Sequence, residues 1–310
     1  MKLAYFDDFK LGVLKGDRIV DVTAAVADIP HVEPRDLIGG LIARFADYRK
    51  RLEEVVARES GIALAGVRLR PPLPKPGTIV CMAVNYMEDG TRSEPAPINA
   101  FLKSPGAIIG PGDTMELPDV AAKVFEGEAE FAIVIGRRAK NVRAADAMSH
   151  LFGYVNFIDG SARGLLPTGN TFYQMKSRDT FAPIGPYIVT ADEIADPQNL
   201  RVTLSVNGAV KQDFNSSDMA HKIPRCIEWV SAIHTLEPGD LMATGTNHRG
   251  LNAFHDGDVV ELETEGLGRL RIDVRDPLER TWSRETRLER QDKGLDPLAP
   301  QLSGKYAPAS

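Results

Sequence analysis

Cysteine is scarce in this sequence, which has 310 residues and only Cys81 and Cys226. The two cysteines lie far apart, and neither belongs to a Cys-x-x-Cys pair or to a cysteine and histidine pattern with metal-ligand spacing. The sequence therefore gives no support to a disulfide framework or a zinc site. We expect both thiols to be buried as small apolar side chains.

Long apolar runs are also absent, since none approaches the roughly 20 residues that a membrane span needs. The first residues include Asp7 and Asp8, where a signal peptide carries a basic and then an apolar stretch. A positive field is lacking as well, because the formal net charge is -6 and the Lys and Arg residues are scattered. We expect a cytoplasmic protein that has neither a membrane nor a nucleic acid as its partner.

The chain is long enough for one large domain, or for one domain with a small appendage. Residues 3–23 show short alternating runs around a turn-rich Lys-Gly-Asp-Arg segment, and residues 36–59 have apolar positions at helical spacing. A proline-rich stretch at 70–77 is the expected linker. We predict a small β-rich N-terminal domain over 1–70, a main domain over 71–291 and an extended C-terminal tail over 292–310.

The main domain has many short strand patterns, few helical ones and no regular alternation between the two. Residues 200–212 predict a hairpin through Asn207-Gly208, because this pair tolerates the positive φ angles of a tight turn. Residues 144–151 and 224–234 predict helices. The expected fold class is α+β, with mostly β structure.

One stretch, Val124-Phe-Glu-Gly-Glu-Ala-Glu-Phe-Ala-Ile-Val-Ile-Gly136, places alternate glutamates directly before an apolar segment. Side chains two apart in a strand share a face, so Glu126, Glu128 and Glu130 point the same way. Like charges this close are tolerated on a solvated face or around a bound cation. The spacing alone leaves both interpretations open.

The region from about 76 to 276 resembles the fumarylacetoacetate hydrolase family, and the segment before it resembles the small β domain that many bacterial members carry. The motifs that match, in the family's order, are Glu128-Ala-Glu130-Phe-Ala-Ile-Val-Ile-Gly136, Gly153-Tyr154 with Asp159-Gly-Ser-Ala-Arg163, Lys176-Ser-Arg-Asp-Thr-Phe-Ala-Pro-Ile-Gly-Pro186, Val206-Asn-Gly with Gln212, and Pro238-Gly-Asp with Thr244-Gly-Thr246. The resemblance implies a mixed β-roll that usually forms a homodimer.

The same resemblance implies that Glu128, Glu130 and Asp159 hold Mg²⁺ or Mn²⁺. Three oxygen ligands leave about three positions of an octahedral ion open, where a 2-oxo acid and water can bind. Such an ion stabilises the enolate that forms when a carbon–carbon bond breaks.

Five further residues of the matched motifs receive a role. By resemblance, Lys176 supplies a fixed positive charge beside the substrate oxygens. Gln212 and Thr246 are expected to bind the substrate carboxylate or its tail. We interpret Arg163, and Asp179 with it, as structural.

The chain departs from the family in one loop. Hydrolytic members usually have Asn-Tyr-x-x-His after the first core strand, with an acid three residues later, and this pair activates water. Here the loop reads Asn85-Tyr-Met-Glu-Asp89, followed by Arg92, so the usual base is missing. Asp89 could accept a proton if its pKa were raised, and Glu88 is a weaker rival.

A second departure follows Thr246, where the family commonly has proline and this chain has Asn-His-Arg-Gly. His248 is either a solvent-exposed loop histidine or an acid, base or carboxylate ligand. An imidazole can both accept and donate a proton near neutral pH, which favours the catalytic role. Arg249 is expected to clamp a carboxylate.

The function expected from these residues is the metal-dependent hydrolysis of a carbon–carbon bond in an acylpyruvate-like 2,4-dioxo acid, as met in the catabolism of aromatic rings or deoxy sugars. One alternative is a metal-dependent isomerase, decarboxylase or hydratase that acts on a 2-oxo diacid, which the missing histidine favours. Another is a non-catalytic family member that binds a 2-oxo acid.

Overall fold

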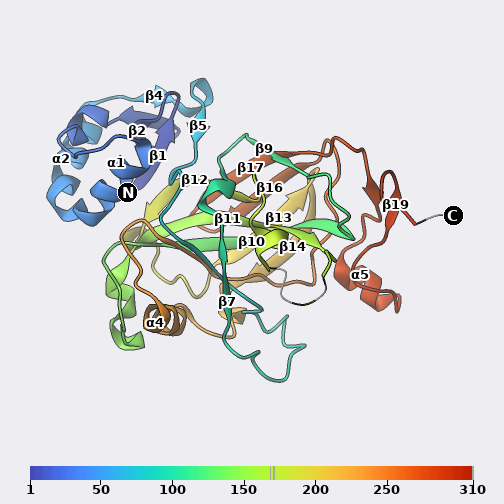
Figure 1. The fold of residues 1–310 in the computed structure, drawn as a ribbon. Coiled ribbons are helices and arrows are strands. Elements are labelled where there is room, and N and C mark those ends of the chain that lie inside the picture. Colours follow the sequence, from blue (N-terminus) through green and yellow to red (C-terminus); the bar gives the residue numbers. More distant parts are fainter. Residues whose placement is uncertain (168, 170–171, 309–310) are drawn as a thin grey trace.

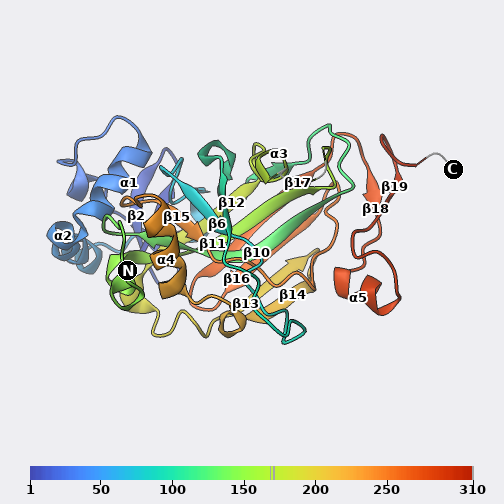
Figure 2. The ribbon, with the colours of Figure 1, turned by 60° about the horizontal axis from the view of Figure 1, so that its bottom comes forward.

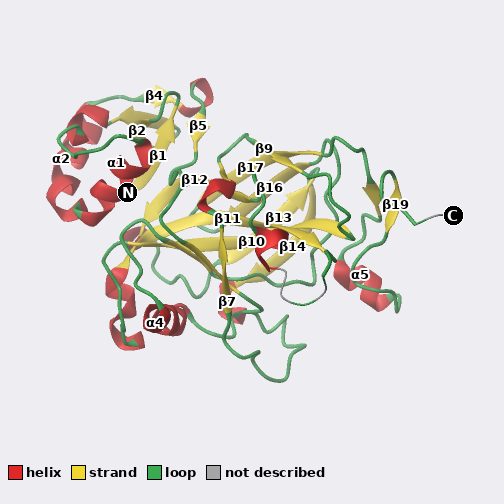
Figure 3. Ribbon diagram, viewed as in Figure 1, coloured by secondary structure: helices red, strands yellow, loops and turns green. Residues whose placement is uncertain are grey.

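The computed structural model describes residues 1–167, 169 and 172–308. Strands run through the middle of the molecule, and helices lie at its periphery (Figure 3). This arrangement confirms the predicted class, an α+β fold with mostly β structure. None of the helices in the described part of the chain combines the length and the apolar character needed to span a membrane.

The larger sheet has 12 strands among the described residues, in the order β4-β3-β2-β1-β12-β11-β10-β15-β6-β7, with β5 beside β1 and β8 beside β12. Its strands are β1 (Lys2–Phe6), β2 (Lys10–Lys15), β3 (Arg18–Asp21), β4 (Ile62–Ala63), β5 (Leu69–Arg70), β6 (Ile79–Met82), β7 (Ala100–Lys103), β8 (Ile108–Ile109), β10 (Val124–Ile135), β11 (Leu151–Arg163), β12 (Ala182–Thr190) and β15 (Leu241–Ala243).

A smaller sheet, ordered β14-β13-β16-β17-β9, packs against the larger one, and a third pairs β18 with β19 (Figure 2). Their strands are β9 (Thr114–Glu116), β13 (Arg201–Val206), β14 (Ala209–Asn215), β16 (Val259–Thr264), β17 (Gly268–Arg275), β18 (Thr281–Trp282) and β19 (Gln301–Ser303). The predicted hairpin is β13 and β14, and both Asn207 and Gly208 have positive φ.

The α-helices of the described residues are α1 (Pro34–Ala43), α2 (Phe45–Arg58), α3 (Phe172–Lys176), α4 (Ile223–Ile233) and α5 (Arg287–Asp292). Short 3₁₀ helices span Thr23–Val26, Leu64–Gly66, Pro105–Ala107, Ala144–His150, Ala191–Glu193 and Ser216–Asp218. The helix predicted over 224–234 is α4, and the one predicted over 144–151 is a 3₁₀ helix.

The helical pattern over residues 36–59 is correct, and the helical segment contains one break. Arg44 has φ −123° and ψ 25°, outside the helical region, so the segment forms α1 and α2. Gly39 and Gly40 give the first of them a low helix propensity. Apolar residues of both helices pack on the N-terminal strands.

The N-terminal strands extend the larger sheet. Lys2 of β1 pairs with Val189 of β12, and Leu3 pairs with Ile188. Figure 1 shows this segment at one end of the molecule and α5 with β19 at the other. In the C-terminal region, β19 pairs with β18. The domain boundaries near residues 70 and 291 remain a prediction.

The long antiparallel pair of β10 and β11 forms the centre of the larger sheet, with Glu128 opposite Asp159. Along β10 the glutamate face continues into Ala132 and Val134, which lie in the apolar core shared with the N-terminal strands. On the opposite face, the ring of Phe254 packs so close to Gly127 that an added Cβ would lie 2.4 Å from it. One face of β10 is therefore apolar for half its length and acidic for the other half.

A buried ion pair ties the C-terminal region to this centre. Arg280 donates from Nε to Oδ2 of Asp276 at 3.0 Å and from Nη2 to Oδ1 at 2.9 Å, and both side chains have no exposed surface. Its guanidinium also bonds three backbone carbonyls and lies 4.7 Å from the ring centre of Phe125.

Removing Arg280 should therefore destabilise the fold. We expect Arg280→Leu to lower the free energy of unfolding by about 3 to 5 kcal/mol, because Asp276 is left charged and buried without its partner. Urea unfolding followed by circular dichroism measures the change. The matched control is Arg201→Leu, which breaks an exposed two-bond pair with Asp213 and should change stability little. Equal effects of the two variants would contradict the account.

Candidate metal centre and active site

Three carboxylates meet on the acidic face of the central strands. Glu128 and Glu130 come from β10 and Asp159 from β11, and each offers an oxygen within 4.8 Å of the others. The register explains the arrangement, because Glu128 and Asp159 are direct cross-strand partners and Glu130 is two residues further along the same face. The sequence prediction had named this set, and the structure brings all three together.

The alternative of a solvated glutamate face is wrong. Glu126, Glu128 and Glu130 are only 2%, 5% and 1% exposed. The first of these differs from the other two in its partners. Glu126 is bound by Arg287 and by Arg163, whose Nε lies 3.1 Å from Oε2. Glu126 therefore forms an ion-pair cluster with these two arginines beside the carboxylate triad.

Arg163 contacts the triad itself, because it also donates to Glu128. The guanidinium thus joins Glu126 to Glu128. The expected structural role of Arg163 fits this position at the edge of the site. Asp179, also expected to be structural, lies in the loop after α3 and lines a separate surface pocket with Tyr173 and Arg178.

Two buried lysines contact Glu128 and Asp159 of the triad. Lys176, the last residue of α3, has its Nζ 2.7 Å from Oε1 of Glu128 and 2.5 Å from Oδ2 of Asp159. Lys103, the last residue of β7, has its Nζ 2.5 Å from Oδ1 of Asp159. Burial opposes the charge of Lys176, but Asp159 and Glu128 outweigh it and raise its pKa. For Lys103 burial prevails and lowers the pKa.

The carboxylates differ in how they are stabilised. Burial alone favours protonation of Glu128, but Lys176 and Arg163 outweigh it and hold its pKa well below the usual range. Glu130 accepts from the backbone N–H of Gly245 at 2.6 Å. Burial, together with the charges of Asp159 and Glu128, raises the pKa of Glu130 well above its usual range.

These residues fit a hard divalent cation. Such ions prefer oxygen ligands, and the triad supplies three in a buried place. A cation between them would stabilise the charged form of Glu130, for which the protein itself supplies a backbone N–H.

The hydroxyl group of Thr246 lies next to this centre and is hydrogen-bonded to Gln212. Gln212 accepts from the backbone N–H of Ala129 at 3.0 Å and donates from Nε2 to Oγ1 of Thr246 and to the carbonyl of Asn247. Both amide hydrogens of Gln212 are therefore occupied. Since Thr246 accepts from Gln212, its own hydroxyl proton remains to bind a ligand oxygen. Gln212 thus positions Thr246, and its expected contact with the substrate remains a prediction.

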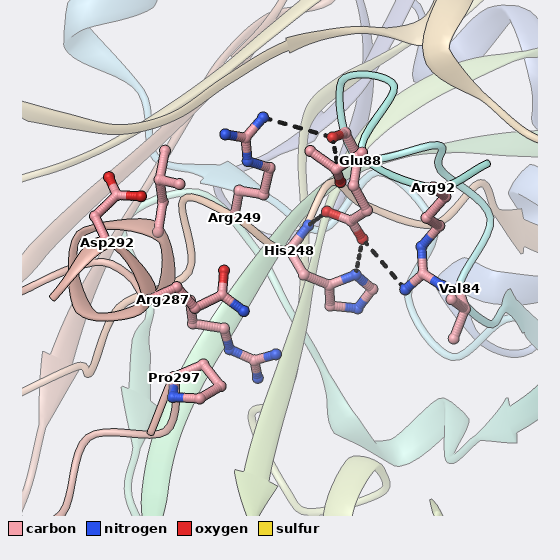
Figure 4. Close-up of a pocket in the computed structure, with 11 residues that line it drawn as sticks. Val84, Glu88, Arg92, His248, Arg249, Arg287, Asp292 and Pro297 are labelled. Carbon is pink, nitrogen blue, oxygen red and sulfur yellow. Dashed lines mark hydrogen bonds and ion pairs between the residues drawn. The ribbon is translucent and has the colours of Figure 1, made fainter. Parts of the chain in front are cut away.

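The loop histidine is held by a carboxylate. Nδ1 of His248 lies 2.7 Å from Oε1 of Glu88, and its backbone N–H donates to Oε2 at 2.9 Å. Both residues line an open cavity of about 710 Å³, as Figure 4 shows. His248 is therefore paired with a carboxylate and only 23% of its side chain is exposed, and its catalytic role remains a prediction.

Asp89 has a different environment from its neighbour. Its side chain is 50% exposed and pairs with Arg249 at 3.1 Å, whereas the side chain of Glu88 is 8% exposed. The loop thus turns Glu88 toward the cavity and Asp89 toward solvent, with both residues at positive φ. Asp89 as the base remains a prediction, and Glu88 is the carboxylate that contacts His248.

Two site residues were missed by the sequence analysis. Lys103 ends the short strand β7 and belongs to no motif, so its position beside Asp159 depends on the pairing of β7 with β6 in the sheet. Arg287 begins α5, far along the chain from Glu126. The capping box of Thr286 and Glu289 could have predicted the helix start, but not its partner.

The fold and the carboxylate centre together define a family. The model of the fumarylacetoacetate (FAA) hydrolase C-terminal family matches residues 78–275, and the chain belongs to this family. The predicted family, fold class and enzyme class, a metal-dependent hydrolase, are thereby confirmed.

Two proteins and one crystal structure illustrate which members of the family this chain is similar to. The maleylpyruvate hydrolase of Aquipseudomonas alcaligenes is 33% identical over 291 residues, which cover 89% of this chain and 99% of that protein. A crystal structure of maleylpyruvate hydrolase from Sphingobium sp. SYK-6 with manganese(II) ion and pyruvate is 36% identical, with a TM-score of 0.81 and coverage of 89% and 99%. A mitochondrial oxaloacetate tautomerase of Bos taurus is 39% identical over 210 residues, 64% of this chain and 66% of that protein.

Metal binding should depend on the triad and not on the third glutamate of the strand. We expect Glu130→Ala and Asp159→Ala to abolish measurable Mn²⁺ binding in titration calorimetry, because two carboxylates hold the ion poorly. Glu126→Gln, a matched control on the same strand face, should keep the affinity within a few-fold. Unaltered binding in both triad variants, or an equal loss in the control, would overturn the assignment.

Proposed function

We propose that this protein hydrolyses an acylpyruvate, with Mg²⁺ or Mn²⁺ held by Glu128, Glu130 and Asp159. Water adds to the distal carbonyl carbon of the 2,4-dioxo acid, the bond between C3 and C4 breaks, and the products are a carboxylic acid and pyruvate. The enzyme acts in the cytoplasm as a homodimer. The observation that carries the proposal is a buried carboxylate triad together with a cavity lined by a carboxylate–histidine pair. The two are linked by Arg287, which lines the cavity and binds Glu126 on the strand face of the triad.

The relatives support the substrate class. Two of those described above are maleylpyruvate hydrolases, and one of their structures contains manganese(II) and pyruvate, the product that every acylpyruvate hydrolase releases. Each matches nearly nine tenths of this chain, so the likeness extends beyond residues 78–275.

The residues around the triad provide substrate binding. A divalent cation there supplies Lewis-acid stabilisation of the oxygens of a 2-oxo acid. Lys176, charged and buried, adds a fixed positive charge beside them. The hydroxyl of Thr246, oriented by Gln212, donates to the carboxylate of the pyruvate moiety.

Glu88 and His248 together activate the water molecule. With a proton on Nδ1, the imidazole donates to Oε1 of Glu88 at 2.7 Å, and Nε2 is left as the nitrogen that accepts a proton from water. The carboxylate then stabilises the imidazolium that forms. The proton returns from His248 to the departing C3 carbon, so that pyruvate leaves.

A tautomerase is the second candidate. One relative of 39% identity is an oxaloacetate tautomerase, and tautomerisation needs proton transfer but no attack by water. The same triad and the same imidazole can serve it. The two candidates differ in their products, since tautomerisation leaves the carbon skeleton whole.

A count of products distinguishes the candidates. Incubated with a panel of acylpyruvates and Mn²⁺, the protein should release pyruvate and a free acid in equal amounts, measured by coupled reduction of pyruvate and by chromatography. A best substrate that yields one product of unchanged mass would instead assign the tautomerase or isomerase reaction.

The proton-transfer residues can be ranked by substitution. We expect His248→Ala to lower kcat by about 10²-fold or more, the usual scale for a general acid–base residue. Glu88→Gln should lower kcat by a smaller factor, because glutamine still contacts the ring but does not stabilise the imidazolium. Asp89→Asn should have little effect. An inactive Asp89→Asn with a nearly active His248→Ala would show that Asp89 is the base.

A further inference from the structure

Arg92, in the loop after β6, lines the cavity that contains His248, on the side opposite Arg287 and Asp292 of α5 (Figure 4). The same cavity is also lined by the side chains of Arg249, Arg287 and Asp292. Three guanidinium groups thus face one open space of about 710 Å³. Several guanidinium groups around one cavity are typical of a binding site for a planar anion such as a carboxylate.

Two of the three arginines are already engaged. Arg287 forms a two-bond pair with Glu126, from Nε to Oε1 at 2.9 Å and from Nη2 to Oε2 at 2.5 Å. Arg249 pairs with Asp89 at 3.1 Å and reaches the carbonyl of Glu88. Both therefore have their charge balanced by the protein itself.

The charge of Arg92 is not balanced by a hydrogen-bonded carboxylate. Its nearest described carboxylate oxygen is Oε1 of Glu88, 3.9 Å from Nη2, which is too long for a hydrogen bond. That oxygen is already bonded to His248 at 2.7 Å. In addition, Nε of Arg92 is buried and has no hydrogen-bond partner among the described residues. A buried donor without a partner is unfavourable, and a ligand that accepts from it gains accordingly.

We propose that Arg92 binds a second carboxylate at the far end of the substrate and so selects dicarboxylic acylpyruvates. This inference rests on the proposed function, because it assumes that the 2-oxo acid end lies at the carboxylate triad. The planar fork of a guanidinium matches a carboxylate in a two-bond geometry, which a lysine cannot reproduce. Specificity then arises because a neutral tail leaves the donors of Arg92 without an acceptor.

The direct test compares two substrates in Arg92→Met, which keeps the apolar stem of the side chain and removes the fork. We expect kcat/KM for maleylpyruvate to fall by about 10- to 100-fold, mainly through KM, as for a lost hydrogen bond to a charged group. For acetylpyruvate, whose tail is a methyl group, it should stay within about two-fold. Arg92→Lys should recover part of the loss.

The control is Arg138→Met, which removes an exposed arginine paired with Glu237 on the surface. It should leave the kinetics for both substrates unchanged. An equal fall for maleylpyruvate and acetylpyruvate in Arg92→Met would overturn the inference, and so would unchanged values for both.

A binding experiment separates this inference from the proposed reaction. Titration of the Mn²⁺-loaded protein compares 2-oxoadipate with 2-oxohexanoate, which has the same chain length but no distal carboxylate. The unmodified protein should prefer 2-oxoadipate, and Arg92→Met should lose the preference. If the preference is lost as expected but no acylpyruvate is cleaved, the proposed reaction fails while the role of Arg92 stands. A preference that survives in the variant refutes that role.

Discussion

The structure depends on balancing charge inside the protein, where an unpaired carboxylate is costly. The buried acids of the site are Glu126, Glu128, Glu130 and Asp159, and the cations that contact them are Lys103, Lys176, Arg163 and Arg287. With all of these charged, four negative and four positive groups cancel. A divalent cation would add a surplus of positive charge, which suits an anionic substrate such as a 2-oxo acid.

The site combines residues from within the family match over 78–275 with residues from the segment that follows it. The triad lies on two central strands whose register fixes it, and these strands fall within the family match over residues 78–275. Arg287 lies beyond that match, yet it binds Glu126 and lines the cavity. The segment after residue 275 therefore lines the cavity that the proposal assigns to the substrate tail, while the triad lies on the central strands.

Much of the fold and of the carboxylate site could be predicted from the sequence, because residue alternation and the order of motifs can be read from the chain itself. The spacing of Glu128 and Glu130 showed that they share a strand face, and the Asp159 motif supplied the third carboxylate by resemblance. The contact of Glu88 with His248 was not predictable, since it follows from the loop conformation that turns Asp89 outward. Lys103 was missed because strand register, which no local pattern encodes, places it at the site.

Anomalous diffraction at the manganese edge, from crystals grown with Mn²⁺ and pyruvate, tests the central claim most directly. The account predicts one strong peak within bonding distance of carboxylate oxygens of Glu128, Glu130 and Asp159, with pyruvate next to it and next to Thr246. A peak at another place, or a triad that remains bound only to Lys176 and Lys103 without manganese, would contradict it.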